Sequence, residues 1–460
     1  MMYLSALVQA LAATLQGEDA YFTRVSTDTR KVASGDLFVA LRGEHFDGGA
    51  FVAQAIQSGA VAALVDHAQA EKIGLVQDAD GCPISLLIVP DTRLALGQLA
   101  AFWRIQFDLP LVGITGSNGK TTVKEMLASI FRVAAGDGDA VLYTQGNLNN
   151  DIGLPLTLLR LTAHHRFAVI EMGMNHTGEI DYLTRIARPQ VALITNASGA
   201  HLAGLGSVAA VAEAKGEIFA GLAAEGIAVI PADDDHADLW RELAGSRSRM
   251  EFGLQRDAQV SRTWQPSGVG SWLQVNTPVG HFEVVLQVPG EHNVRNALAA
   301  TAAALALQIP VAAIVAGLQQ FGGVAGRLQR KIVQQGVVVL DDTYNANPAS
   351  VRAAIKVLVQ AQGKRILVLG DMGELGEDGA KLHGEIGVFA KEAGVAQLYA
   401  LGELSQYAVA EFGDGAQHFA CVADLWVALK EVLAENTTIL VKGSRFMKME
   451  TVVQALETKN

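Results

Sequence analysis

The chain has 460 residues, of which 50% are hydrophobic and 18% are charged, and its formal net charge at pH 7 is −12. This composition is typical of a globular protein with about three domains and excludes an intrinsically disordered chain. The negative charge argues against nucleic acid as a partner, and it means that local positive groups must hold any anionic substrate.

Residues 1–90 are expected to form a small α/β domain. The chain begins with an apolar stretch, residues 1–15, without Lys or Arg in front of it, so we interpret it as an amphipathic helix and not as a signal peptide. The apolar face of this helix would consist of Leu4, Leu7, Val8, Leu11 and Leu15. Further on we expect a helix over 51–59 and short strands within 35–41, 60–65 and 85–89.

A polar turn follows the opening helix of this domain. Its residues are Ser26, Thr27, Asp28, Thr29 and Arg30. Such a turn can bind a diphosphate or a sugar, but on these residues alone a solvated loop explains the pattern equally well.

Residues 91–326 are expected to form a second domain around a doubly wound parallel sheet, because apolar runs alternate with helical stretches. Strands are expected at 109–114, 141–144, 167–172, 191–196 and 227–231, with a helix over 92–107. Short alternating runs between residues 250 and 289 predict hairpins attached to this sheet. The Ala-rich stretch 296–321 is broken by Pro310, so two buried helices explain it better than a membrane span.

The loop after the first of these strands has the composition of a phosphate-binding loop. Gly116 and Gly119 allow the backbone N–H groups to turn inward, and the helix that begins at the loop adds its partial positive charge. Lys120 would reach the β- and γ-phosphates of a nucleotide, and the hydroxyl of Thr121 would bind Mg²⁺. The residues assigned to this loop are Thr115, Gly116, Ser117, Asn118, Gly119, Lys120, Thr121 and Thr122.

Ligands of an open parallel sheet bind beyond the carboxyl ends of its strands, so the residues there are candidates for a site. Glu171 is placed to supply a second Mg²⁺ ligand, although a carboxylate at this position could also cap the following turn. His201, in the loop after the next strand, would by default be a surface histidine. Lys215, on a helical stretch, would by default be a solvated lysine.

Two polar clusters further along favour nucleotide handling. Asn293 and Asn296 open the Ala-rich helix, where they could read the edge of a base or cap the helix. The stretch 341–348 follows a buried strand, and a carboxylate there, such as Asp342, could hold ribose hydroxyls.

Residues 327–460 are expected to form a third domain, because a second set of strands and helices alternates there. The strands are expected at 336–340, 365–369, 397–401 and 438–441. This pattern predicts a nucleotide-binding-type sheet without a phosphate loop of its own. The two cysteines, Cys82 and Cys421, belong to no metal-binding motif, so we expect reduced core thiols of a cytoplasmic protein.

Motifs spread along the chain resemble those of the Mur ligase family. They are GITGSNGKTT (113–122), TQGNLNNDIGLPLTLL (144–159), AVIEMGMNHTGEI (168–180), AEAKGEIF (212–219), GEHNVRNALAA (290–300), GR (326–327), DDTYNANPAS (341–350), GDMGELG (370–376) and LVKGSR (440–445). The likeness extends from the turn at 26–30 to the C-terminus. Ile114, which stands where the usual phosphate loop has Gly, matches the family's own form of that loop.

The resemblance implies an ATP-dependent amide ligase of cytoplasmic peptidoglycan precursor synthesis. It would join D-alanyl-D-alanine to UDP-N-acetylmuramoyl-tripeptide through an acyl phosphate, with two Mg²⁺ ions and a carbamylated Lys215. It would work as a monomer, without nucleic acid and without membrane insertion. The implied fold is α/β with three domains: an N-terminal UDP-binding module (1–90), a central doubly wound P-loop ATPase sheet (91–326) and a C-terminal Rossmann-like domain (327–460).

The resemblance also implies roles for single residues at matching positions. Lys120, Lys215, Glu171 and His201 would be catalytic, and Thr121 would join the last three in binding metal. Besides the phosphate loop, the nucleotide would contact Asn293, Asn296, Arg327, Asp342, Tyr344 and Asn347. The UDP-peptide would contact Ser26, Asp28, Thr29, Arg30, Asn147, Asn149, Asn150, Lys442, Ser444 and Arg445.

Two alternatives stay open at this point. One is a sister amide ligase, such as a folylpolyglutamate synthase-like enzyme, against which the turn at 26–30 and the GDMGELG motif argue. The other is a nucleotide-regulated switch protein that forms no bond, because phosphate loops also serve that purpose. The sequence does not distinguish diaminopimelate from lysine as the third residue of the tripeptide.

Overall fold

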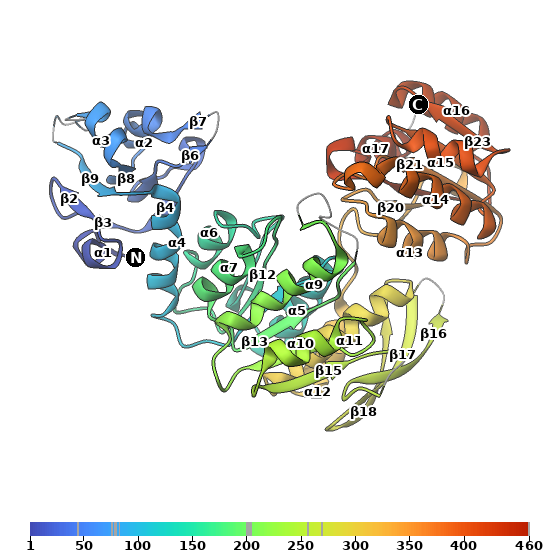
Figure 1. The fold of residues 1–460 in the computed structure, drawn as a ribbon, viewed down its shortest axis with the longest axis horizontal. Helices are drawn as coiled ribbons and strands as arrows, with labels where there is room; N and C mark the ends of the chain where they lie inside the picture. The colour runs from blue at the N-terminus through green and yellow to red at the C-terminus, as the bar shows by residue number, and fades with distance from the viewer. Residues whose placement is uncertain are drawn as a thin grey trace.

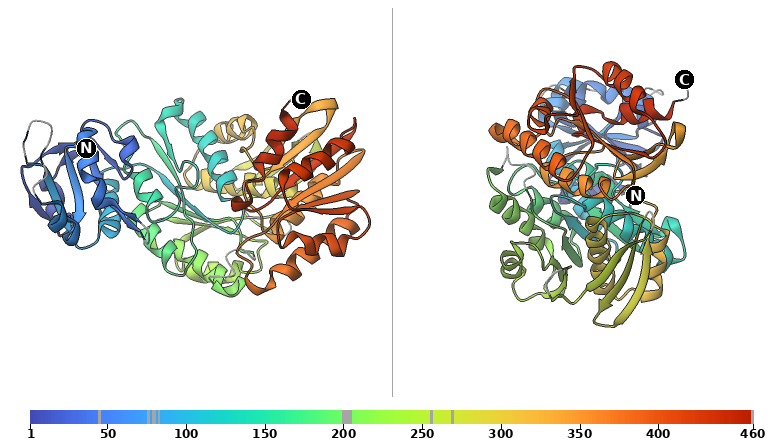
Figure 2. Two further views of the ribbon diagram at one scale, coloured as in Figure 1. Left: turned by 90° about the horizontal axis from the view of Figure 1, so that it is seen from above. Right: turned by 90° about the vertical axis from the view of Figure 1, so that its right-hand side faces the viewer.

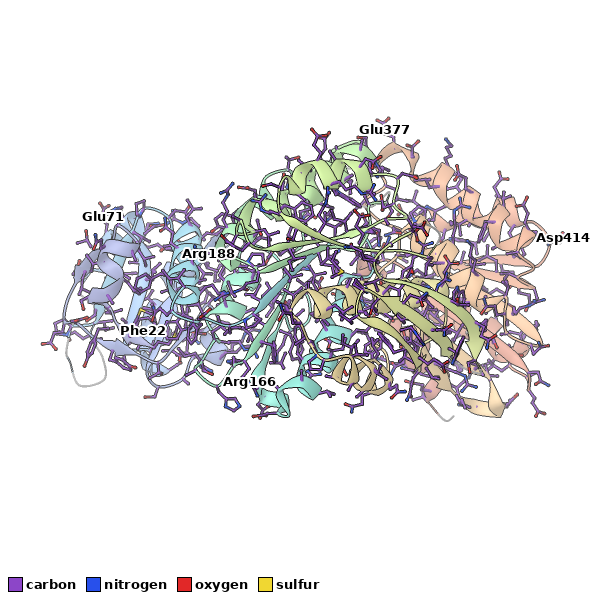
Figure 3. The ribbon with its side chains drawn as sticks, turned by 90° about the horizontal axis from the view of Figure 1, so that it is seen from below. Phe22, Glu71, Arg166, Arg188, Glu377 and Asp414 are labelled. Carbon is purple, nitrogen blue, oxygen red and sulfur yellow. The ribbon has the colours of Figure 1, made fainter. Side chains whose placement is uncertain are left out.

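The computed structural model describes residues 1–43, 46–74, 77, 81, 83–198, 205–254, 257–267 and 270–458. The chain passes through three α/β units that follow one another along the molecule, which confirms the predicted fold class (Figure 1). Figure 2 shows the same order from above, with the N-terminal unit at one end and the C-terminal unit at the other. The labelled Glu71 and Asp414 mark these two ends in Figure 3.

The N-terminal unit contains a five-stranded sheet in the order β2-β9-β8-β5-β4, parallel except for β2. The strands are β2 (Thr14–Gln16), β4 (Arg24–Ser26), β5 (Asp36–Val39), β8 (Ala62–Asp66) and β9 (Ser85–Val89). Its helices are α1 (Ser5–Ala10), α2 (Val52–Gln57) and α3 (His67–Ile73), and a short ribbon pairs β1 (Met2–Tyr3) with β3 (Tyr21–Phe22). The predicted strands and the helix near 51–59 are confirmed.

The opening helix is shorter than predicted. It ends at Ala10, and Leu15 lies in β2, where it pairs with Leu87 of β9. Ala12 has a positive φ of 48°, so the chain turns there, and from Thr14 onward it pairs with β9 instead of continuing the helix. Leu4, Leu7 and Leu11 are buried, as expected for the apolar face.

The central unit contains a six-stranded, fully parallel sheet in the order β11-β12-β10-β13-β14-β15. The strands are β10 (Leu111–Thr115), β11 (Val141–Tyr143), β12 (Phe167–Glu171), β13 (Val191–Ile194), β14 (Ile227–Pro231) and β15 (Ser248–Phe252). A three-stranded antiparallel sheet follows, with β16 (Ser261–Ser267), β17 (Gly270–Thr277) and β18 (Gly280–Leu286). These confirm the predicted hairpins, except that β15 belongs to the parallel sheet.

Two helical layers cover the central sheet, because its buried strands place apolar residues alternately on both faces. Ile170 and Ala192 face one core, whereas Val169 and Leu193 face the other. The first core is built with α4 (Thr92–Arg104), α6 (Gly153–Leu158), α7 (Glu179–Ala187), α9 (Val208–Gly216) and α10 (Ala237–Ala244). The second is built with α5 (Lys120–Ala135), α11 (Glu291–Ala306) and α12 (Val311–Gln320), and the last two confirm the helix pair around Pro310.

Helix α4 joins the first two units. Leu96 and Leu99 of this helix share one apolar core with Leu37 and Leu64 of the N-terminal sheet and with Ile170 of the central sheet. Among the helices that the structure describes, none is long and apolar enough to cross a membrane.

The C-terminal unit contains a six-stranded sheet in the order β19-β20-β24-β21-β22-β23, parallel except for β19. The strands are β19 (Gln329–Ile332), β20 (Val338–Asp342), β21 (Lys364–Gly370), β22 (Gln397–Leu401), β23 (Ala416–Phe419) and β24 (Thr437–Lys442). Helices α13 (Pro348–Leu358), α14 (Gly379–Glu392) and α15 (Ser405–Phe412) pack on one face, and α16 (Val422–Val432) and α17 (Glu450–Glu457) on the other.

Two predictions for this unit need correction. The edge strands β19 and β23 were not predicted, because their polar residues lack the apolar pattern of a buried strand. Cys421 was expected in a core but is exposed, because it lies at the N-terminal cap of α16. Cys82 lies outside the described residues.

The crossing of α5 and α12 depends on Gly317, because a Cβ there would collide with the backbone of Ile130. We expect Gly317→Ala to lower the free energy of unfolding by about 1–3 kcal/mol, despite the better helix propensity of Ala. Thermal unfolding measures this. Gly322→Ala is the control, since a Cβ at Gly322 meets nothing within 4 Å. An unchanged Tm for Gly317→Ala would show that α5 and α12 can move apart without a loss of stability.

Candidate active site

The predicted phosphate loop connects β10 to α5, and its geometry agrees with the prediction. Gly116 and Gly119 have positive φ angles of 144° and 84°, which residues with a Cβ rarely adopt. A Cβ on Gly119 would also collide with the side chain of Asn296, so α11 approaches the loop closely. Lys120 folds back over the loop, where Nζ donates to the carbonyl of Gly116 at 2.7 Å. Burial lowers the pKa of Lys120, although Glu171 opposes this shift.

Glu171, at the end of β12, lies directly beside the loop. Its Oε2 accepts a hydrogen bond from Thr121 Oγ1 at 2.9 Å, and its Oε1 accepts one from Asn149 Nδ2 at 2.9 Å. The carboxylate therefore does not cap the turn that follows the strand. Arg327, from beyond the central unit, donates from its guanidinium to Thr121 Oγ1 at 3.0 Å. The hydroxyl of Thr121 and the carboxylate of Glu171 are thus in direct contact, at the strand ends where the sequence placed both.

The loop is braced by the segment that follows β13 and by the C-terminal unit. Asn118 N donates to Asn196 Oδ1 at 3.1 Å, and Asn118 Nδ2 donates to Ser198 Oγ at 2.9 Å. Asn347 Nδ2 donates to Asn118 Oδ1 at 2.9 Å. Asn347 also caps α13, where its side chain accepts from Ser350 N at 2.9 Å. The phosphate loop and the first helix of the C-terminal unit are therefore in direct contact.

Lys215 is buried, contrary to the solvated lysine that its position on a helix suggested. Its exposed fraction is 0%, and Nζ has no hydrogen-bond partner among the described residues. Helix α9 places it against the central sheet, so burial holds the pKa of Lys215 well below its ordinary value. The charge of Lys120 lowers this pKa further, whereas Glu171 raises it. His201 lies outside the described residues.

The start of α11 supplies a polar wall. Asn293 Nδ2 donates to the carbonyl of Pro289 at 2.8 Å, and Asn296 Nδ2 donates to Asn293 Oδ1 at 3.3 Å. Neither residue caps the helix, because Gly290 occupies the cap position. Burial lowers the pKa of the neighbouring His292 to about 4, so its imidazole is neutral at pH 7.

The C-terminal unit contributes a buried ion pair. Lys442 Nζ lies 2.6 Å from Asp342 Oδ2, and Asp342 Oδ1 accepts from the backbone N–H of Leu328 at 3.1 Å. The two residues are opposite each other at the carboxyl ends of β20 and β24. Nearby, the guanidinium of Arg327 stacks 4.4 Å from the ring centre of Tyr344. Both oxygens of Asp342 therefore already have protein partners.

These groups face one cleft of about 1100 Å³ between the central and C-terminal units. The predicted site residues that line it are Ser117, Asn118, Gly119, Lys120, Thr121, Thr122, Asn147, Asn149, Asn150, Glu171, Asn293, Asn296, Arg327, Asp342, Tyr344, Asn347, Lys442, Ser444 and Arg445. Thr115, Gly116 and Lys215 are buried and do not line it.

The turn at 26–30 is not part of this cleft. Ser26 ends β4 in the N-terminal unit, and Asp28 caps the short helical turn that contains Thr29 and Arg30. Arg30 donates to the two Asp28 oxygens at 2.9 and 2.8 Å, which lowers the pKa of Asp28 to about 2. The side chain of Arg30 is 86% exposed, so it is accessible to a ligand.

Sequence reasoning missed several residues that line the cleft. They include His292, Arg295, Asp234, Glu374 and Phe446. Asp234 follows β14, and its Oδ2 accepts from the backbone N–H of Ala197 at 3.0 Å, so it holds the segment that braces the phosphate loop. The rule that sites form at the carboxyl ends of parallel strands pointed to this position, where all three consecutive aspartates, residues 233–235, line the cleft.

Family models match successive parts of the chain. The model described as "Mur ligase family, catalytic domain" matches residues 21–104. The "Mur ligase middle domain" matches residues 114–304, and the "Mur ligase, glutamate ligase domain" matches residues 326–445.

Proteins and structures similar to the whole chain are also known. The chain is 44% identical over 458 residues to UDP-N-acetylmuramoyl-tripeptide–D-alanyl-D-alanine ligase of Escherichia coli (strain K12), covering 99% of this chain and 98% of that protein. The structure matches MurF from Acinetobacter baumannii with a TM-score of 0.90 and 39% identity, covering 100% of this chain and 99% of that one. MurF ligase from Thermotoga maritima in complex with ADP matches with a TM-score of 0.81 and 25% identity, covering 96% of this chain and 98% of that one.

The ion pair at the base of the cleft generates a stability prediction. Lys442→Met removes one partner and leaves the Asp342 carboxylate buried without its cation, so we expect the free energy of unfolding to fall by about 3–5 kcal/mol. Urea denaturation measures the change. Lys381→Met, at an exposed lysine of α14, is the control. The double variant Asp342→Asn/Lys442→Met should recover part of the loss, and an equal or larger loss would contradict this explanation.

Proposed function

This chain belongs to the Mur ligase family, and on that premise we propose that it adds D-alanyl-D-alanine to UDP-N-acetylmuramoyl-tripeptide with the hydrolysis of ATP. It is an ATP-dependent acid–amino acid ligase of peptidoglycan synthesis. Its relatives carry this activity in their names and align with nearly the whole chain. They favour this ligase over the folylpolyglutamate synthase-like alternative.

The single observation that carries the proposal is the hydrogen bond between Thr121 of the phosphate loop and Glu171 at the end of the adjacent strand. A nucleotide-binding switch needs only the loop, whereas this cleft also contains Arg327, Lys442 and Asn149 around it. Arg327 lines the cleft, and its buried Nε has no hydrogen-bond partner in the described part of the chain, so protein acceptors do not saturate the guanidinium.

The reaction needs such a cleft because a carboxylate resists attack by an amine. A carboxylate oxygen of the tripeptide attacks the γ-phosphorus of ATP, the bond to ADP breaks, and an acyl phosphate forms. The free amine of D-alanyl-D-alanine then attacks the acyl carbon, and the tetrahedral intermediate collapses to the amide as phosphate leaves and the amine proton is lost. Lys120 would stabilise the charge on the transferring phosphoryl group, and a closed cleft would keep water from the acyl phosphate.

The side chains present fit Mg²⁺. In the described ranges no group of three or more His, Cys, Asp or Glu could hold a metal ion. Mg²⁺ does not need such a group, since it is usually bound by one or two carboxylates together with substrate phosphates and water. We propose that Thr121 and Glu171 hold one ion and that Glu171, His201 and Lys215 contribute to a second. The ions would neutralise phosphate charge.

Lys215 is proposed to act as a carbamate. Its buried Nζ lacks a hydrogen-bond partner among the described residues, and a bare ammonium next to metal ions would be repelled. The lowered pKa of Lys215 favours the neutral amine that reacts with CO₂. The resulting anion would suit a metal site.

The remaining predicted residues are proposed to bind the substrates outside the reacting centre. The turn with Ser26, Asp28, Thr29 and Arg30 would bind the UDP moiety, and Asn147, Asn149 and Asn150 would lie near the tripeptide. Asn293, Asn296, Asp342, Tyr344 and Asn347 would surround adenosine, while Lys442, Ser444 and Arg445 would place substrate. These nucleotide substrates favour a cytoplasmic enzyme, and we retain the predicted monomer and the three proposed domains.

Phosphate release tests the function. The wild-type protein should release phosphate continuously only when ATP, the UDP-tripeptide and D-alanyl-D-alanine are all present. Lys120→Ala should reduce this turnover by about 10²–10³-fold or more, because it removes a cation at the transferring phosphoryl group. Steady hydrolysis of ATP without either peptide substrate would favour the switch protein. Normal ligation by folded Lys120→Ala would remove Lys120 from the mechanism.

Chemical rescue tests the carbamate. Lys215→Ala should be nearly inactive, and a short carboxylic acid in solution should restore part of the activity by placing an anion in the vacated space. Lys120→Ala is the matched control, because an anion cannot replace its cation. Full activity of Lys215→Ala would show that the carbamate role is wrong.

A further inference from the structure

We propose that Lys124 is a positioning residue for Glu171 and acts on it through Thr144. The proposal rests on the proposed function, in which Glu171 binds Mg²⁺. Lys124 has no contact with the cleft. Two hydrogen bonds nevertheless connect it to Glu171. Lys124, on helix α5, donates to Thr144, and Thr144 accepts from the backbone N–H of Glu171.

Lys124 is unusual because it is a lysine inside the core. It lies one helical turn after Lys120 on α5, and its exposed fraction is 1%. Burying an ammonium is costly unless it is paired and hydrogen-bonded. Its Nζ donates to the carbonyl of Thr144 at 2.6 Å and lies 2.9 Å from Glu125 Oε1. One backbone carbonyl and one carboxylate therefore stabilise the buried ammonium of Lys124.

Thr144 is the connecting residue. It follows β11 directly and is fully buried. Its Oγ1 accepts a hydrogen bond from the backbone N–H of Glu171 at 2.9 Å, and its own N–H donates to the carbonyl of Val169 at 3.1 Å. Because Lys124 holds the carbonyl of Thr144 on the other side, the threonine hydroxyl has one fixed position beneath Glu171.

Helix α5 consequently fixes Glu171 at two points. Thr121 contacts the carboxylate directly, and Lys124, three residues later on the same helix, fixes the backbone through Thr144. The carboxylate of a metal ligand needs such support, because outer partners of ligands typically change metal affinity or activity by about 10–100-fold. Movement of Glu171 relative to Thr121 would separate the two oxygen ligands.

The chain offers a matched control for the packing of Lys124. Its Nζ lies 5.6 Å from the ring centre of Tyr143, and Arg132, two turns later on α5, stacks on the same ring at 4.8 Å. Both are cations of α5 over one aromatic ring. Of these two cations, only Lys124 has a described hydrogen bond to Thr144, so Arg132→Met separates the packing contribution from the positioning one.

The experiment measures Mg²⁺ dependence in the full-length protein. Lys124→Met keeps the length of the side chain and removes its donor. We expect the Mg²⁺ concentration for half-maximal binding of a fluorescent ADP analogue to rise about 10-fold or more. The same shift should appear in the Mg²⁺ activation of ligation, while the KM for D-alanyl-D-alanine stays unchanged. Arg132→Met should leave the Mg²⁺ dependence unchanged, even if it lowers Tm.

A second set of variants tests the route through Thr144. Thr144→Val keeps the shape but removes the acceptor for Glu171 N, so it should reproduce the Mg²⁺ shift. Thr144→Ser keeps the hydroxyl and should behave as the wild type. The double variant Lys124→Met/Thr144→Val should be no worse than the more affected single variant, because both act on one route. If Lys124→Met does not fold, the difference in Mg²⁺ dependence between Thr144→Val and Thr144→Ser tests the proposal.

A normal Mg²⁺ dependence of Lys124→Met, or of Thr144→Val, would overturn the proposal. Additive shifts in the double variant would do the same. Glu171→Gln is measured in parallel to separate this inference from the proposed function. If Glu171→Gln shifts the Mg²⁺ dependence and Lys124→Met does not, only the positioning role is wrong. If Glu171→Gln also leaves it unchanged, the metal-binding role of Glu171 is wrong and the positioning role falls with it.

Discussion

The hydrogen bond between Thr121 and Glu171 is the contact on which the cleft depends, because it joins the phosphate loop to the neighbouring strand. A parallel sheet makes this contact possible. β10 and β12 are adjacent, with Ile114 opposite Glu171, so both carboxyl ends reach the same edge. Ile114 lies inside the core, where a strand needs an apolar side chain and the usual loop has Gly. One edge of one sheet therefore supplies the phosphate cradle and the carboxylate together.

The rest of the site is assembled around that edge from other units. Arg327 reaches Thr121, and Asn347 reaches Asn118, so two side chains of the C-terminal part contact the loop that would hold the phosphates. The turn with Arg30 stays in the N-terminal unit, outside the cleft. A long substrate with a UDP moiety at one end and a reacting carboxylate at the other would bridge this separation.

The sequence predicted the core strands well and the edges poorly. Buried parallel strands such as β9 and β14 consist of apolar runs, whereas β19 and β23 are polar and have no such pattern. For the site, the neighbourhood of Thr121 and Glu171 followed from the rule for strand ends. The burial of Lys215 could not be predicted, because the sequence around a single lysine among small residues does not distinguish a buried lysine from an exposed one. Its proposed role rests on the resemblance.

Asn347 is subject to two requirements at once. Its Oδ1 caps α13 by accepting from Ser350 N, and its Nδ2 donates to Asn118 in the phosphate loop. Asp would preserve the cap but has no donor for Asn118, and Gln has the donor but is too long for the cap. Of the side chains that cap helices well, only Asn offers an acceptor and an amide donor on so short a stem. Position 347 is therefore restricted to Asn by its contact with the neighbouring unit as well as by its own helix.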